Sequence, residues 1–406
     1  MPREAHAIGF PKTTAGAPFG PVVARPPFTQ TSCATTAPLC VHAGATVSAT
    51  TLTATRELAT STWLDLEVLK LPRPLLELDG KVHLYLADVP EEDGLRVGRG
   101  RLDLLLDRDA APAFVVLDEG HAAAGGCALR ARVAEGLTLA SAYAVDVGEA
   151  PFVLRGLARH AARLVSPCPA ESEARLVRWQ AQPWKAMDVD GVEYVIRFLD
   201  ERRGKGFGAI VPALLSMAIE HRGIVEPALD DDLGPAHFHD ETSVFDVLSA
   251  TMKDGGGSLD ELLVDVAVAR ALEAVGPVLE WDVLASSLPR RLAVRRPIEP
   301  TGTTYLRVKL DAMPKGGGVD FDLEWEQGAR FVWRAVKLDA AGKVVGEVRP
   351  PVLETARKFT LDVRALQGVA TIVLVGVQSG DPHKPWRPAE PLGYGHAYEV
   401  GIFAAE

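Results

Sequence analysis

The stretch CALRARVAEGLTLASAYAVDVGEAPFVLRGLARHAARLVSPC, residues 127–168, predicts two helices joined by a short turn. Apolar residues of its first half recur at helical spacing: Leu129, Val133, Leu137, Ala140 and Ala144. Pro151 suits the first turn of the second helix, whose inner face carries Leu154, Leu157, Ala158, Ala161 and Val165. Two helices joined by so short a turn run antiparallel, so Cys127 and Cys168 should be neighbours and could close the hairpin as a disulfide.

The chain contains four cysteines, Cys33, Cys40, Cys127 and Cys168. None forms a Cys-x-x-Cys pair, which disfavours a zinc ribbon or a thioredoxin-like redox site. We favour two structural disulfides, Cys33–Cys40 and Cys127–Cys168. The alternative is four buried free thiols.

Composition excludes some classes of function. The 406 residues are 47% hydrophobic and carry a net charge of −11, which argues against a nucleic-acid partner because phosphate contacts need a concentrated basic surface. The one basic cluster, Arg290, Arg291, Arg295 and Arg296, is interpreted as a solvated linker. No apolar run reaches the roughly 18 residues that a transmembrane segment requires. The N-terminus shows no basic segment followed by an apolar core, so no secretory signal is expected in this chain.

Periodicity predicts an α+β protein in three parts. Residues 1–45 should form an extended arm that ends in a short strand at 39–42. Residues 46–292 should form a small sheet plus a helical bundle, and residues 297–406 an antiparallel β-sandwich. Strands are expected at 82–86, 102–106 and 113–117. Beside the hairpin, helices are expected at 49–69, 192–203, 210–220, 243–252 and 259–272.

The arrangement resembles bacterial secreted zinc metallopeptidases of the His-Glu-x-x-His, gluzincin-like type. The likeness begins with the helix that ends in Trp63 before a proline-rich loop, the strand His83-Leu84-Tyr85-Leu86 and the segment 113–117. It continues through the helix pair and the helix that contains residues 194–199, to a β-rich C-terminus that opens at Glu299-Pro300. The resemblance implies a zinc-dependent peptidase fold for most of the chain.

The metal-binding signature is where the sequence departs from this family. The resemblance places the two histidine ligands at Ala134 and Thr138, and the third ligand at or beside Arg155. Alanine has no donor atom, threonine is a poor zinc ligand, and a guanidinium repels a cation. Only Glu135 remains, at the general-base position, where it has no metal-bound water to activate. The competing interpretation of Glu135 is an ordinary helix glutamate, either solvated or paired with Arg132.

Two other groups of residues are candidate sites. His237, His239 and Asp240 could hold a metal at the surface, or could form a polar loop before a helix. Trp325 and Trp333 could line a sugar-binding platform, although at strand spacing they suit a core.

We therefore expect a non-catalytic, pseudopeptidase-like binding or structural protein that works in the bacterial envelope or outside the cell, extracellular or periplasmic. It would have no cofactor and an unknown protein or polysaccharide partner. One alternative is an active zinc-dependent hydrolase that uses His237 and His239. A second alternative is a carbohydrate- or surface-binding module formed by residues 297–406.

Overall fold

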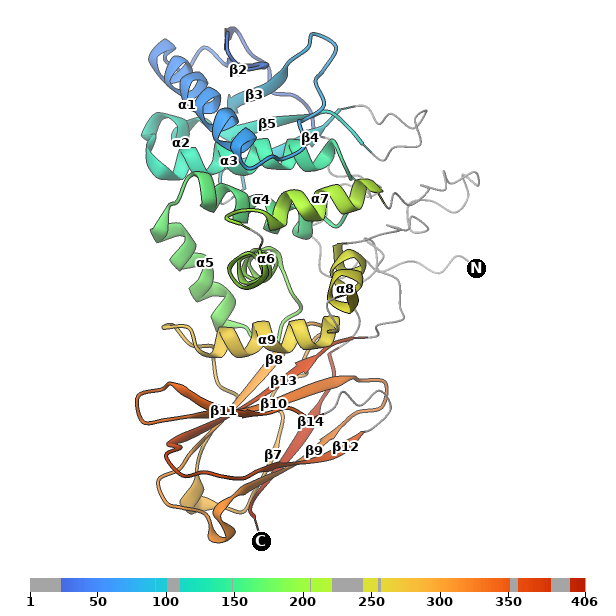
Figure 1. Cartoon of the computed structure of the whole chain (residues 1–406). Coiled ribbons are helices and arrows are strands. Elements are labelled where there is room, and N and C mark those ends of the chain that lie inside the picture. The colour runs from blue at the N-terminus through green and yellow to red at the C-terminus, as the bar shows by residue number, and fades with distance from the viewer. Residues whose placement is uncertain are drawn as a thin grey trace, which may run out of the picture. The chain divides into compact units, whose positions relative to one another are not determined.

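The chain folds into two compact units (Figure 1). The computed structural model describes residues 23–91, 93–100, 110–147, 149–204, 206–220, 244–254, 257–350, 357–380 and 395–405. Unit 1 comprises residues 1–174, 188–247 and 386–391, and unit 2 the remainder. The predicted strand at 102–106, most of the predicted arm, and His237, His239 and Asp240 lie outside the described residues.

Unit 1 is built on a five-stranded mixed sheet. Its strands are β1 (Gln30–Cys33), β2 (Leu39–Ala43), β3 (Val82–Ala87), β4 (Leu95–Arg99) and β5 (Ala113–Asp118). The spatial order is β1-β2-β3-β5-β4. The central strands β2, β3 and β5 run parallel, whereas β1 and β4 pair antiparallel at the two edges. Almost every residue of β2, β3 and β5 is buried, as is usual for parallel strands covered on both faces.

Helices α1 (Ala49–Val68), α2 (Glu119–Ala124) and α3 (Gly126–Tyr143) pack on this sheet. Helix α4 (Pro151–Val165) packs on α3, α6 (Val189–Arg203) on α4, and α7 (Ile210–Glu220) on α6. Two glycines set the packing distances. A Cβ on Gly136 would lie 2.5 Å from a methyl of Val115, so the glycine lets α3 approach β5. A Cβ on Gly156 would lie 2.5 Å from Val192, so α4 and α6 make a similarly close contact.

Both expected disulfides are present. Cys33–Cys40 joins β1 to β2, with Cα atoms 4.0 Å apart. Cys127–Cys168 joins the start of α3 to the residues after α4, with Cα atoms 5.4 Å apart. The antiparallel hairpin of α3 and α4 therefore forms as its short turn predicted, and Pro151 is the first residue of α4.

Unit 2 is a β-sandwich with one covering helix, α9 (Leu259–Ala271), which packs on β10 and β13. One sheet has the order β11-β10-β13-β8-β6 and the other β12-β9-β14-β7. The strands are β6 (Trp281–Leu284), β7 (Arg290–Ala293), β8 (Thr303–Lys309), β9 (Val319–Trp325), β10 (Phe331–Leu338), β11 (Val344–Val348), β12 (Lys358–Val363), β13 (Thr371–Gln378) and β14 (Tyr398–Ala404). All pairs are antiparallel except β6 with β8.

The predicted α+β class with a C-terminal β-sandwich is confirmed, and several local expectations are corrected. Two sandwich strands, β6 and β7, come from residues before 297, because their four-residue lengths give no visible alternation. The basic cluster interpreted as a solvated linker contains β7, which pairs with β14. Helix α5 (Pro169–Ala181) was not expected, because only Gln180 of it is buried and it has no apolar stripe. Unit boundaries fall within α5 and within α8 (Val244–Asp254).

No helix in the described ranges is long and apolar enough to cross a membrane.

The disulfide between α3 and α4 gives a first prediction. After denaturation without reductant, thiol-directed labelling should leave Cys127 and Cys168 unmodified. The double variant Cys127→Ser/Cys168→Ser should lose about 4 kcal/mol of unfolding free energy, because the bridge closes a loop of 41 residues in the unfolded chain. Urea denaturation measures this loss, and labelling of both cysteines in the unreduced parent would contradict the bridge.

Candidate functional site

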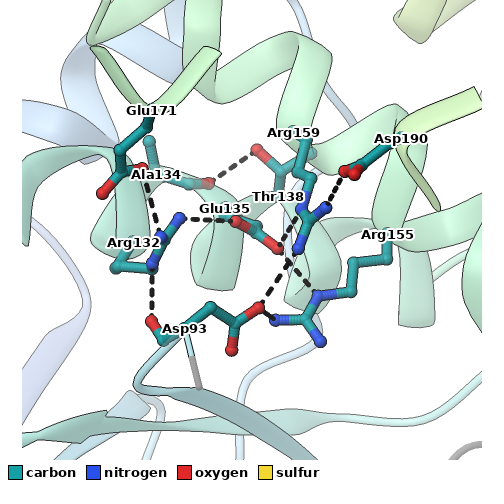
Figure 2. A network of polar contacts seen from close by, with 9 residues as sticks. All are labelled: Asp93, Arg132, Ala134, Glu135, Thr138, Arg155, Arg159, Glu171 and Asp190. Carbon is teal, nitrogen blue, oxygen red and sulfur yellow. Dashed lines mark hydrogen bonds and ion pairs between the residues drawn. The ribbon is translucent and has the colours of Figure 1, made fainter. Parts of the chain in front are cut away.

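Glu135 and Arg155, two of the candidate site residues, lie in a network of charged side chains within unit 1 (Figure 2). Helix α3 supplies Arg132 and Glu135, and α4 supplies Arg155 and Arg159. Three carboxylates from other segments complete the network: Asp93 before β4, Glu171 at the start of α5 and Asp190 in the first turn of α6. Sequence positions nearly 100 residues apart therefore meet at one point.

Glu135 lies at the centre of this network and is only 1% exposed. Arg155 Nε donates to its Oε1 at 2.9 Å, and Arg159 Nε donates to the same oxygen at 3.3 Å. Arg132 Nη1 donates to Oε2 at 3.4 Å. The pairing with Arg132 that sequence reasoning considered is present, but Glu135 is neither solvated nor paired with a single partner.

Asp93 is a second centre of the network. Its Oδ2 accepts hydrogen bonds from Arg155 Nη2 and, at 3.1 Å, from Arg159 Nη2. Its backbone carbonyl oxygen accepts from Arg132 Nε at 2.6 Å. The turn that presents Asp93 depends on Gly94, whose φ is +64° and whose Cβ would overlap the ring of His121.

The remaining two carboxylates, Glu171 and Asp190, contact Arg132 and Arg159. Arg132 Nη2 lies 3.1 Å from Glu171 Oε2, and Arg159 Nη1 donates to Asp190 Oδ1 at 2.6 Å. Arg132 and Arg155 therefore each contact two carboxylates and Arg159 contacts three, and the seven side chains together carry one net negative charge.

Neighbouring charges keep Arg155 and Asp93 ionised. Burial by itself would lower the pKa of Arg155, but the charges of Glu135 and Asp93 outweigh burial and raise it above the usual arginine value. Burial would raise the pKa of Asp93, yet Arg155 and Arg159 hold it below the usual range. Both groups therefore stay charged across the physiological range of pH, and neither is poised to exchange a proton.

Ala134, Thr138 and Arg155, where the resemblance expected metal ligands, offer no site for a metal ion. Ala134 is fully buried, and Thr138 Oγ1 donates to the Ala134 carbonyl oxygen at 2.8 Å inside the helix (Figure 2). Arg155 points at Glu135 rather than into an open coordination site. Within the described ranges, no group of three or more His, Cys, Asp and Glu side chains is arranged to hold a metal ion. A general base must also reach a water or substrate, and Glu135 is closed off by guanidiniums.

A small hollow of unit 1, about 290 Å³, lies elsewhere on α3. Its lining combines the end of α1, the proline-rich loop after it, and Leu137 and Ser141 of α3. No residue of the charged network lines this hollow.

A second polar cluster lies on the sheet of unit 1, and sequence reasoning did not foresee it. His42 Nε2 lies 2.8 Å from His83 Nδ1, linking β2 to the neighbouring β3. Thr31 Oγ1 lies 2.9 Å from His42 Nδ1, and His83 Nε2 lies 3.1 Å from Asp79 Oδ1. Each of the four ring nitrogens of His42 and His83 therefore has a hydrogen-bond partner. Both histidines stood in predicted strands, but only strand order reveals that the strands are neighbours.

The buried histidines give a prediction about acid stability. Burial, with the nearby His83, lowers the pKa of His42 to about 4, and burial with Arg163 does the same for His160. The unfolded chain therefore binds protons between about pH 6.5 and about pH 4 that the folded chain does not, so stability falls as the pH drops through this window. His42→Gln should make this pH dependence shallower, as measured by urea midpoints near pH 7 and pH 5. The exposed His121→Gln is the control, and equal slopes in all three proteins would contradict the assignment.

Glu135 gives a prediction about stability. Glu135→Gln should lower the unfolding free energy by about 3–5 kcal/mol, because it leaves buried guanidinium charge without its central partner. Glu171→Gln, at the more exposed rim of the network, should cost about 1 kcal/mol or less. Urea denaturation of both variants and the parent measures the difference. A cost for Glu135→Gln equal to that of Glu171→Gln would show that the network is not centred on Glu135.

Comparison with known proteins adds little to this site. No family model matches the chain, and no curated protein matches it. The pre-peptidase C-terminal domain of a collagenase from Bacillus anthracis is similar to 31% of this chain over 98% of its own length, with 11% identity and a TM-score of 0.21. The enzymatically active domain of bacteriophage CBA120 tailspike protein 4 covers 29% of this chain with 17% of its own length, at 14% identity and a TM-score of 0.19. VP2 of infectious bursal disease virus covers 29% with 32% of its length, at 11% identity and a TM-score of 0.19. At these TM-scores the similarities carry no argument about function.

Proposed function

We propose that this chain is a non-catalytic binding or structural protein built on a metallopeptidase-like domain. One observation carries the proposal: the glutamate at the expected general-base position is 1% exposed and neutralised by Arg132, Arg155 and Arg159. In the peptidase chemistry, zinc would supply the positive charge that polarises a water molecule. Here arginines supply positive charge at Glu135, and a guanidinium has no open coordination position for water.

The order of elements supports a peptidase-like domain as the scaffold. A mixed sheet comes first, then α3 on that sheet, then the antiparallel partner α4. This is the order that the resemblance to His-Glu-x-x-His peptidases implied. The signature positions Ala134, Glu135 and Thr138 lie on α3, and Arg155 reaches them from α4, as expected of a third ligand position.

The two disulfides support a working place outside the cytoplasm. Disulfides form and persist in oxidising compartments, and the described chain contains no free cysteine. We propose an extracellular or periplasmic location in a bacterium.

A sugar platform on the sandwich loses its support. Trp325 and Trp333 are 5% and 4% exposed and pack against Phe331 and Tyr398 in the core of the sandwich. Neither ring face is open to a carbohydrate. A carbohydrate-binding function of residues 297–406 would therefore require residues other than these two tryptophans.

Metal analysis tests the proposal. Protein purified without chelators or a histidine tag should contain no stoichiometric zinc and should not cleave an unstructured protein such as casein. Zinc near one equivalent, lost in His237→Ala together with metal-dependent cleavage, would replace the proposal with an active hydrolase whose ligands lie at His237 and His239.

Restoring the ligands tests the scaffold itself. The triple variant Ala134→His/Thr138→His/Arg155→Glu should bind about one zinc per chain, because it places two imidazoles one helical turn apart with a carboxylate on the facing helix. Adding Glu135→Gln should leave zinc binding intact, since Glu135 is not a ligand. Elemental analysis after dialysis reads out both variants. If the triple variant does not fold, Ala134→His/Thr138→His is the second variant, and a folded variant that holds no zinc would contradict the resemblance.

A further inference from the structure

One segment of unit 2 concentrates positive charge in an acidic chain. Four arginines, Arg290, Arg291, Arg295 and Arg296, lie within seven residues, and all four are exposed. Across the part of the chain that the structure describes, none of the four forms an ion pair with a carboxylate. The chain as a whole carries −11, so this local excess is not a general property of its surface.

Three acidic residues near this segment in the sequence contact other groups. Glu299 Oε1 lies 3.1 Å from Lys185 Nζ. Glu280 Oε1 accepts a hydrogen bond from the backbone amide of Arg295 at 2.6 Å, not from its guanidinium. Asp282 is shared between Arg307 Nη2 at 2.5 Å and Lys309 Nζ at 3.1 Å. These carboxylates therefore form no ion pair with the four arginine side chains.

The same segment is a sheet edge. Among the described strands, β7 is the outermost of its sheet and pairs with β14 alone, with Leu292 opposite Val400. The amide of Val294 donates to the Tyr398 carbonyl at 3.0 Å, which fixes the alternation along the strand. The amides and carbonyls of Leu292 thus face β14, and those of Arg291 and Ala293 face outward. Within the described ranges, the outward groups of Arg291 and Ala293 have no backbone partner.

Two of the arginines are fixed in place by tryptophan rings. The guanidinium of Arg295 lies 4.0 Å from the ring centroid of Trp281, and that of Arg296 lies 3.9 Å from the ring centroid of Trp184. Cation–π stacking of this kind uses the guanidinium face and leaves its in-plane N–H donors available. The two side chains are therefore pre-positioned cations, and less side-chain entropy is lost when an anion binds.

We propose that residues 290–296, the β7 edge, bind an acidic peptide segment that adds to the sheet as an extended strand. The outward backbone groups of Arg291 and Ala293 would pair with the backbone of the incoming strand. The arginine side chains would pair with carboxylates along it, and charge-assisted hydrogen bonds from guanidinium to carboxylate are among the stronger polar contacts.

The charges also explain why the occupant is acidic and why it is a peptide. Charged side chains on an edge strand repel unwanted pairing, and here two β7 edges of separate copies would bring arginine against arginine. A neutral strand gains only backbone pairing at this edge and a basic strand is repelled by the arginines, whereas an acidic strand gains both backbone pairing and charge attraction. An anionic polymer without amide groups could contact the arginines but could not reproduce the paired donors and acceptors of a strand.

Binding of a defined peptide to the full chain tests this proposal. The probe is a fluorescein-labelled peptide of about eight residues that alternates glutamate and threonine, followed by fluorescence anisotropy at low and physiological salt. Arg290→Glu/Arg291→Glu should weaken binding by about tenfold or more. Lys343→Glu/Arg349→Glu changes two exposed cations at the β10–β11 hairpin by the same net charge, and it should change affinity by about twofold or less. Equal losses in the two double variants, or no binding by the parent, would overturn the proposal.

Two further arms separate strand pairing from simple charge attraction. The same peptide N-methylated at alternate residues keeps every carboxylate but cannot pair as a strand, so its binding should fall by about tenfold or more. Ala293→Pro keeps every charge of the protein and removes one outward N–H, which an edge strand tolerates, and it should weaken the unmodified peptide similarly. If the N-methylated peptide binds as well as the parent peptide, or the Pro variant binds normally, the edge does not pair with a strand and the proposal fails. None of these readouts depends on metal content, so the test is independent of the peptidase-like site.

Discussion

The burial of a single carboxylate, Glu135, is the constraint on which unit 1 depends. An ionised carboxylate out of water is tolerated only when opposite charges and hydrogen-bond donors surround it. Arg132, Arg155 and Arg159 provide them, and their own burial demands the further carboxylates of the network. Helices α3 and α4, the first turns of α5 and α6, and the turn before β4 are thereby tied to one point.

This constraint also accounts for the proposed loss of catalysis. A zinc peptidase keeps a metal with one open position beside a glutamate that can exchange protons. Arginine is permanently charged and has no such position, so in the proposed pseudopeptidase the guanidiniums around Glu135 stabilise the fold and activate no water. On α3, Thr138 donates to the Ala134 carbonyl oxygen within the helix, and Gly136 lets the helix lie close on Val115.

Unit 2 is stabilised by an apolar core rather than by a buried ion network. Trp325 and Trp333 are buried in the core between the two sheets, and the proposed recognition relies on charge and on a sheet edge instead. The β7 edge combines both: outward backbone groups at Arg291 and Ala293, and stacked cations at Arg295 and Arg296. The described part of the chain thus combines a buried ion network in unit 1 with a cluster of exposed arginines in unit 2.

The sequence by itself determined the features that depend on neighbours along the chain. Helical spacing and a short turn were enough to predict α3 and α4, and the antiparallel hairpin then placed Cys127 beside Cys168. Strand alternation after residue 300 was enough to predict a sandwich, although β6 and β7 before it were missed. Tertiary structure alone decided which charges meet. Nothing in the spacing of Asp93 and Asp190 connects them to Arg159, and nothing connects His42 to His83, because these contacts depend on strand order and helix packing rather than on periodicity. Periodicity along the chain predicts which face of a helix or strand is buried. It does not predict which helices and strands pack together, and a buried ion network depends on that packing.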